Sequence, residues 1–217
     1  MDRLISIIGP AIPQTLIMVF ASTFIAIILG LPLGVILTIT RKDGLCQNLK
    51  IYSVLDKIIN ILRSFPFIIL VIVVFPLSRI LVGKAYGTAA MIIPLSISAA
   101  PFVARLMEGY FNQIDKGIIE AAKSVGSTNI QIITRVLIPE AMPMIVNGIT
   151  MTLINVVGYS AMAGAIGGGG LGDIAIRYGY QMRDEVILWS TVVLIILLVQ
   201  IVQVIGNRIE KKIDRRF

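Results

Sequence analysis

Long stretches of the chain carry no charged side chain, and their lengths predict its main elements. A helix needs about 20 mostly apolar residues to cross the ~30 Å hydrocarbon layer of a membrane. Four uncharged runs are long enough, and the spans expected within them are residues 15–37, 85–104, 141–166 and 186–207. The pattern therefore predicts at least four membrane-spanning helices.

A fifth span has to be assembled around a shorter uncharged run. Residues 64–78 are too few to cross a bilayer, so the expected span is 58–78 and includes Arg63. One interpretation of Arg63 is a snorkelling side chain that reaches the headgroups. The other is a gate or packing anchor beside Pro66. The total is then five spans.

The rest of the pattern favours one helical domain. We see no convincing strand alternation and no internal repeat, so the expected fold is all-α, a polytopic membrane protein with a single transmembrane domain over residues 1–217. The first apolar run is too long for a cleavable signal peptide and has only Arg3 ahead of it, so we expect the first span to stay in the mature protein. Small residues four positions apart, at Gly30 and Gly34 and at Gly164 and Gly168, predict close helix packing.

The composition excludes most functions of soluble proteins. Hydrophobic residues make up 57% of the chain and charged residues 14%, with a mean hydropathy of +0.92, whereas soluble proteins average about 25% charged residues. The chain has no histidine and only Cys46, which excludes Ser-His-Asp and Cys-His catalysis and an internal disulfide. We expect no metal site and no cofactor.

The net charge of +7 follows the expected topology. One side of the membrane would hold five Lys and Arg residues, namely Arg3, Arg79, Lys84, Arg177 and Arg183. The other side would hold fourteen, in residues 41–63 and 105–135 and at the C-terminus as far as Arg215 and Arg216. Because cytoplasmic loops carry the Lys and Arg excess, we predict an N-terminus outside and a C-terminus in the cytoplasm. We therefore expect the basic residues to determine membrane topology and to contact membrane lipid, and not to bind nucleic acid.

No segment offers ATP chemistry. The phosphate-binding motif G-x-x-x-x-G-K-[ST] is absent, and Gly167, Gly169 and Gly172 have dinucleotide-motif spacing without the preceding strand that such a site requires. The four consecutive glycines at 167–170 instead predict the end of a regular helix. We expect no catalytic residue and no enzyme activity in this chain. No charged residue lies in the middle of the four long runs, which argues against a proton relay.

The loop at residues 105–140 has a helical pattern. Asp115 is expected to cap a short helix with an apolar face, and Gly126 to end it. Thr128 followed by Gln131 matches a capping box, which opens a second helix that we expect to end at Pro139. From the pattern alone, docking to a partner and lying flat on the headgroups are equally good interpretations.

This loop resembles the EAA signature of bacterial ABC importer permeases. Glu120-Ala121-Ala122 is followed by Gly126 four positions after the last alanine, and by Val136-Leu137-Ile138-Pro139 at the position of the family's Ile-x-Leu-Pro. The resemblance implies that Glu120, Ala121, Ala122, Gly126 and Pro139 form a cytoplasmic coupling helix and its flanks, seated in a cleft of a separate ATP-hydrolysing subunit. In this interpretation Glu120 can pair with a basic partner.

A narrower resemblance covers nearly the whole chain. Residues 60–69, 99–105 and 158–172 are similar to the corresponding segments of methionine importer permeases, a small-permease group with five spans. The resemblance implies the ABC type I importer permease fold, a homodimer in the bacterial inner membrane, and a translocation path on its two-fold axis. It further implies two copies of an ATP-binding subunit and an extracytoplasmic methionine-binding protein.

Span four carries our candidates for the path. We expect Tyr159, Ser160 and Met162 to line it, because two offer hydroxyl groups and the third is polarizable. Met162 as ordinary helix packing stays an open alternative. Two other functions compete with the ABC permease, namely an ion-coupled secondary amino-acid transporter acting without an ATPase and a membrane scaffold without transport. The glycine- and proline-broken spans weigh weakly against the scaffold.

Overall fold

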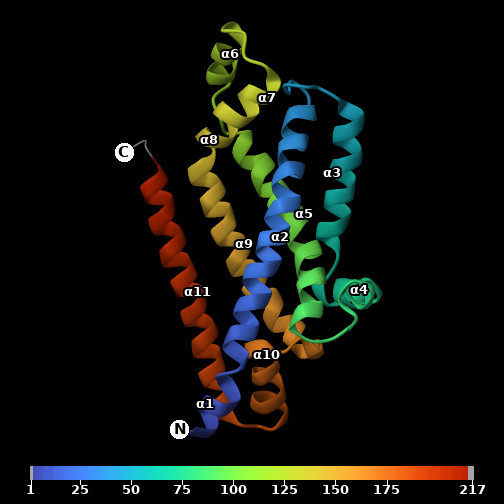
Figure 1. Ribbon diagram of the computed structural model, residues 1–217, viewed down its shortest axis with the longest axis vertical. Coiled ribbons are helices and arrows are strands. Elements are labelled where there is room, and N and C mark those ends of the chain that lie inside the picture. The colour runs from blue at the N-terminus through green and yellow to red at the C-terminus, as the bar shows by residue number, and fades with distance from the viewer. Residues whose placement is uncertain (1, 215–217) are drawn as a thin grey trace.

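The computed structural model describes residues 2–214 as a bundle of helices with no strand in that range (Figure 1). Four helices are long and apolar enough to cross a membrane, and a bent pair would make a fifth span. The all-α membrane fold predicted from the sequence is confirmed. The long elements are α2 (Ala11–Thr40), α5 (Thr88–Phe111), α9 (Met142–Ala163) and α11 (Glu185–Ile213).

Shorter helices complete the bundle. They are α1 (Asp2–Ile8), α3 (Leu49–Ser64), α4 (Phe67–Val82), α6 (Lys116–Ser124), α7 (Asn129–Ile132), α8 (Ile138–Glu140) and α10 (Gly170–Ile174). The π-helical segments Ile133–Leu137 and Ala175–Gln181 join some of them, and Gly164–Gly168 after α9 is kinked, because Ile166 and Gly167 have non-helical backbone angles. Figure 1 places α6 and α7 at one end of the bundle and α1 and α10 at the other, which we call the α6 end and the α10 end.

The predicted second span, 58–78, is not one straight helix. α3 and α4 meet at an angle of 108°, and the break falls at Phe65 and Pro66, both of which have extended backbone angles. Proline disfavours the helical conformation in the residue before it and has no N–H group to continue the ladder. Arg63 is exposed in the last turn of α3, just before the break.

The predicted glycine contacts between helices are confirmed. A Cβ atom on Gly34 would lie 2.5 Å from Cβ of Met107, and one on Gly30 would lie 2.6 Å from Cβ of Val103. α2 and α5 therefore touch nearly backbone to backbone, which suits a membrane setting where close packing rather than water exclusion holds helices together. Gly164 and Gly168 are likewise buried against neighbouring segments.

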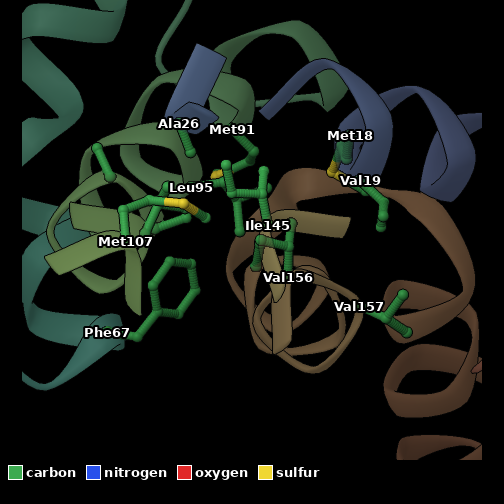
Figure 2. Close-up of a cluster of buried hydrophobic side chains, with 14 of the residues drawn as sticks. Met18, Val19, Ala26, Phe67, Met91, Leu95, Met107, Ile145, Val156 and Val157 are labelled. Carbon is green, nitrogen blue, oxygen red and sulfur yellow. The ribbon is translucent and has the colours of Figure 1, made fainter. Parts of the chain in front are cut away.

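The core lies where α2, α5 and α9 meet, and α4 contributes Phe67 to it. Figure 2 shows side chains from these helices converging, among them the buried residues Met18, Val19, Ala26, Phe67, Met91, Leu95, Met107, Ile145, Val156 and Val157. α11 is mostly exposed, because only 11% of its most apolar stretch is buried within the chain. Its remaining surface is available to lipid or to another subunit.

Basic segments gather at the α6 end, which holds the loop after α2, α6 itself and the last turns of α11 (Figure 1). Arg215 and Arg216, which entered the charge count, lie outside the described residues. The helix α5 runs on to Phe111, so the predicted loop 105–140 begins inside a helix. Arg105 lies within α5, where it pairs with carboxylates on α3 and α5.

Candidate functional site

At the α6 end, local hydrogen bonds define a short projecting helix. The side chain of Asp115 accepts a hydrogen bond from the N–H of Gly117 at 2.7 Å and so caps α6. Gly126 ends the turn after α6 with a φ of +81°, a left-handed conformation that favours glycine. The capping box is present as predicted. The N–H of Thr128 donates to the side chain of Gln131 at 2.9 Å, and the N–H of Gln131 donates to the side chain of Thr128 at 3.3 Å.

The second helix does not end at Pro139. It widens into the π-helical segment Ile133–Leu137 and continues through α8 to Glu140. The N–H of Ile138 reaches back five residues to the carbonyl of Ile133, so the wider turn lies directly before the proline, which has no N–H to donate. Pro139 therefore lies in a helix leading into α9 rather than beside α6.

None of the residues of α6 is buried. Glu120 and Ala121 are exposed and Ala122 is half-buried, so the small residues leave room for close approach from outside. Nearby, Val125 is 81% exposed and Ile130 74% exposed. We call these five residues the α6 surface. Apolar exposure of this extent on a polar, projecting loop is typical of a contact surface for another protein.

A cavity of about 100 Å³ lies beneath α6. Its wall includes Thr38 and Arg41 at the end of α2, Lys123 and Glu120 on α6, and Leu137. The buried Nε atom of Arg41 has no hydrogen-bond partner. The end of α2 and the helix that carries the α6 surface therefore face each other across this cavity.

The three path candidates on α9 do not share one surface. Tyr159 is half-buried and its ring stacks on Phe67, with centroids 4.8 Å apart. Ser160 is 2% exposed, and its hydroxyl donates to the carbonyl of Val157 at 2.7 Å. Met162 is 46% exposed. The helical turn directs Ser160 into the bundle while Met162 faces outward, so Met162 has the most exposed side chain of the three.

Met162 belongs to a stripe that the sequence analysis missed. Met151, Asn155, Gly158, Met162 and Ala165 are exposed or half-buried and recur every three or four residues on one side of α9 and its extension. This spacing follows one helix face. The sequence signal was a polar asparagine and two methionines in helical register within an otherwise apolar span. The stripe is the candidate path surface of α9.

The glycine run ends α9 as predicted. Gly167, Gly169 and Gly170 have φ angles of +90°, +77° and +79°, so the chain turns sharply and then enters α10. We call residues 167–170 the glycine turn. α2 also contacts it, because the N–H groups of Gly170 and Leu171 donate to the side chains of Gln14 and Thr15.

Ionisable side chains offer no metal centre in residues 2–214, where no three His, Cys, Asp or Glu residues gather.

Comparisons with known proteins place this geometry in context. Residues 30–217 match the family described as the binding-protein-dependent transport system inner membrane component. The chain is 49% identical over 203 residues to a probable D-methionine transport system permease protein of Vibrio cholerae, covering 94% of this chain and 90% of that one. It is 45% identical over 181 residues to the methionine import system permease protein of Bacillus subtilis, covering 83% and 82%.

A solved structure is also similar over the whole length. A chain from the inward-facing MetNI methionine ABC transporter superposes with a TM-score of 0.97 at 42% sequence identity, covering 99% of this chain and 100% of that one.

Proposed function

The chain belongs to the family of binding-protein-dependent transport system inner membrane components, and on that premise we propose that it is the membrane permease subunit of an ABC importer for methionine. The similarity to a methionine transporter chain over nearly every residue is the observation that carries this proposal. Its substrate class follows from the relatives in both Vibrio cholerae and Bacillus subtilis. The importer-permease fold expected from the sequence is confirmed by the same likeness.

In this proposal the α6 surface docks into a separate ATP-binding subunit. Ala121 and Ala122 permit close approach, and Glu120 offers a carboxylate to a basic side chain of that subunit. Val125 and Ile130, which the chain itself leaves uncovered, would be buried on docking. Closure of the ATPase on ATP would then move α6, and with it the bundle, between inward- and outward-facing states.

The proposed lining of the translocation path includes fewer of the residues expected from the sequence. Two copies of the chain would face each other across a two-fold axis, with Met162 and its stripe on α9 lining the path between them. Tyr159 would shape the wall through its stack on Phe67. Ser160, with its hydroxyl bonded within the helix, supports the wall rather than contacting substrate in this conformation.

Orientation and outer partners complete the proposal. The basic α6 end would face the cytoplasm, with the N-terminus outside and the C-terminus inside. An extracytoplasmic methionine-binding protein would deliver substrate at the α10 end, and anionic lipid would contact the basic rim. The ion-coupled transporter is not favoured, since the relatives are ABC importer permeases.

Reconstitution tests the proposal. Proteoliposomes with the chain, its ATP-binding partner and the methionine-binding protein should accumulate labelled methionine only with ATP. Glu120→Gln should weaken ATPase binding by roughly 30-fold or more, as expected when a charge pair in an interface loses one member. Lys116→Gln, in the first turn of the same helix, is the matched control and should retain coupling. Uptake driven by an ion gradient without the ATPase would contradict the proposal.

A further inference from the structure

The helix α2 joins two functional regions at opposite ends of the bundle. Its 30 residues give a length of about 45 Å at 1.5 Å per residue, and Figure 1 shows it running from near α6 and α7 to α10. At the α6 end, Thr38 lines the cavity beneath α6 together with Lys123. At the α10 end, Gln14 and Thr15 meet the glycine turn.

The contacts at the α10 end are hydrogen bonds to backbone. The N–H of Gly170 donates to Oε1 of Gln14 at 2.8 Å, and the N–H of Leu171 donates to Oγ1 of Thr15 at 2.8 Å. N–H groups in the first turn of a helix have no acceptor within that helix. The position before α10, Gly169, has no side chain to cap it. The acceptors therefore come from α2, 156 residues earlier in the chain.

The glycine turn depends on such outside contacts for a defined shape. Three of its four residues have positive φ angles, and glycine has the greatest conformational freedom of any residue. A Cβ atom on Gly170 would lie 2.7 Å from Oγ1 of Thr15, so the backbone of the turn is pressed against α2. The Thr15 hydroxyl is buried, and it also donates to the carbonyl of Ala11 at 3.1 Å.

We propose that Gln14 and Thr15 are positioning residues through which α2 transmits displacement of α6 to the glycine turn and thus to the α9 segment that carries Met162. The proposal rests on the proposed transport function for its consequence. Its mechanical part rests on packing. Ile119 of α6 packs against the buried cluster that includes Phe111 of α5, and α2 approaches α5 closely at Gly30 and Gly34, so we treat α2 and α5 as one body. The two hydrogen bonds then link α2 to the turn. The start of α5 also contacts the turn, because the N–H of Gly87 donates to the carbonyl of Gly167 at 2.9 Å and the Thr88 hydroxyl to the carbonyl of Gly168 at 3.5 Å.

Hydrogen exchange in the assembled complex tests the link directly. The complex of chain and ATP-binding partner, in lipid nanodiscs, is followed through peptides covering residues 164–175 with and without ATP. Gln14→Leu and Thr15→Val remove the acceptor atoms, while Gln14→Glu and Thr15→Ser retain them. Thr152→Val is the matched control, since the buried Thr152 hydroxyl donates only to the carbonyl of Gly148, four residues earlier on α9.

In the wild-type complex, ATP should change exchange in residues 164–175. Gln14→Leu and Thr15→Val should raise exchange there roughly tenfold without ATP, because each frees an amide of α10, and should remove the response to ATP. Their methionine uptake per ATP hydrolysed should fall, with ATPase activity kept within about twofold of wild type. Gln14→Glu and Thr15→Ser should restore uptake and the ATP response.

Other outcomes would overturn the link. They are an unchanged ATP response in both acceptor-free variants, an absent ATP response in the wild-type complex, or an equal loss of uptake and ATPase activity such as misfolding produces. A wild-type complex whose exchange responds to ATP as expected but which carries no methionine would refute the substrate assignment and leave the link supported. The experiment therefore distinguishes a failure of the mechanical link from a failure of the substrate assignment.

Discussion

Arg105 and Asp56 join α5 to α3 through a guanidinium nitrogen, Nη2, that lies 2.6 Å from Oδ1 of the carboxylate. The same nitrogen donates to Asn60 at 2.9 Å, and Nη1 donates to Glu108 at 2.5 Å. The hydroxyl of Tyr52 donates to the other oxygen of Glu108 at 3.2 Å. This network of five residues lies beside a buried apolar cluster that includes Ile59 and Ala104, and together they hold the first half of the broken span to the bundle.

Loss of Arg105 should therefore destabilise the protein more than loss of Asp56. Arg105→Met leaves the carboxylate of Glu108, which is 5% exposed, without its charged partner, and hydrogen bonds to charged groups contribute about 1.5–3 kcal/mol. Asp56→Asn keeps a polar acceptor and should cost less. Thermal unfolding in detergent, followed by Trp189 fluorescence, measures both. Lys57→Met, at an exposed neighbour on α3, should leave the midpoint unchanged, and a larger shift for Asp56→Asn than for Arg105→Met would refute this ordering.

Substitutions at Gly126 should follow backbone strain rather than side-chain size. A Cβ atom there meets nothing within 4 Å, yet φ is +81°, and the left-handed conformation costs other residues about 1–2 kcal/mol. Co-purification of the ATP-binding subunit should fall in the order Gly126→Asn, Gly126→Ala, Gly126→Val, because asparagine tolerates this region and β-branched residues do not. Membrane insertion should be unaffected. Equal co-purification of all three would show that the turn does not shape the α6 surface.

Cysteine accessibility should separate Met162 from Ser160. In a Cys46→Ser background, which removes the only native thiol, Met162→Cys should react with a water-soluble maleimide at a rate that changes when ATP is added. Ser160→Cys, at a position that is 2% exposed, should stay at least roughly tenfold less reactive, because burial limits access of the reagent. No labelling of Met162→Cys in either nucleotide state would place it against lipid and remove it from the path.

The α2–α5 contact should not tolerate a methyl group at Gly34. A Cβ atom there would lie 2.5 Å from Cβ of Met107 and 2.8 Å from the carbonyl oxygen of Ala104, and overpacking of this kind costs about 1–3 kcal/mol. Gly109→Ala on α5 is the control. It meets nothing within 4 Å and should stabilise the helix by up to ~1 kcal/mol. The two substitutions should shift the unfolding midpoint in opposite directions. An unchanged midpoint for Gly34→Ala would mean that the helices separate easily.

The sequence predicted the parts of this fold that depend on local chemistry. Uncharged runs located the long helices, and the Asp115 cap, the Gly126 turn and the Thr128 capping box are all present. The sequence predicts one continuous span at 58–78, because about 20 apolar residues are needed to cross a bilayer, but Pro66 breaks the helix. Pro139 is predicted to end the second helix, but the helix continues past it because a π-helical turn accommodates the proline.

The faces of the spans were harder to predict. Polar side chains occur on both sides of α9, with Thr150 and Thr152 buried and Asn155 in the outward stripe, so its sequence does not tell which side meets the core. Ser160 and Met162 are predicted on one surface, although the helix directs them apart. The role of Gln14 and Thr15 depends on residues 156 positions away. Contacts of that kind follow from tertiary packing, and a single amino-acid sequence does not reveal them.

The exposure of Val125 and Ile130 has a consequence for the life of the protein in the cell. A newly made copy that has not met its ATP-binding partner displays both side chains, 81% and 74% exposed, to quality-control proteases that act on uncovered apolar segments. Surplus copies would be degraded while assembled ones persist, so turnover would set the ratio of the two subunits. A pulse-chase comparison should show a shorter half-life without the partner gene, and Val125→Ser with Ile130→Ser should lengthen it.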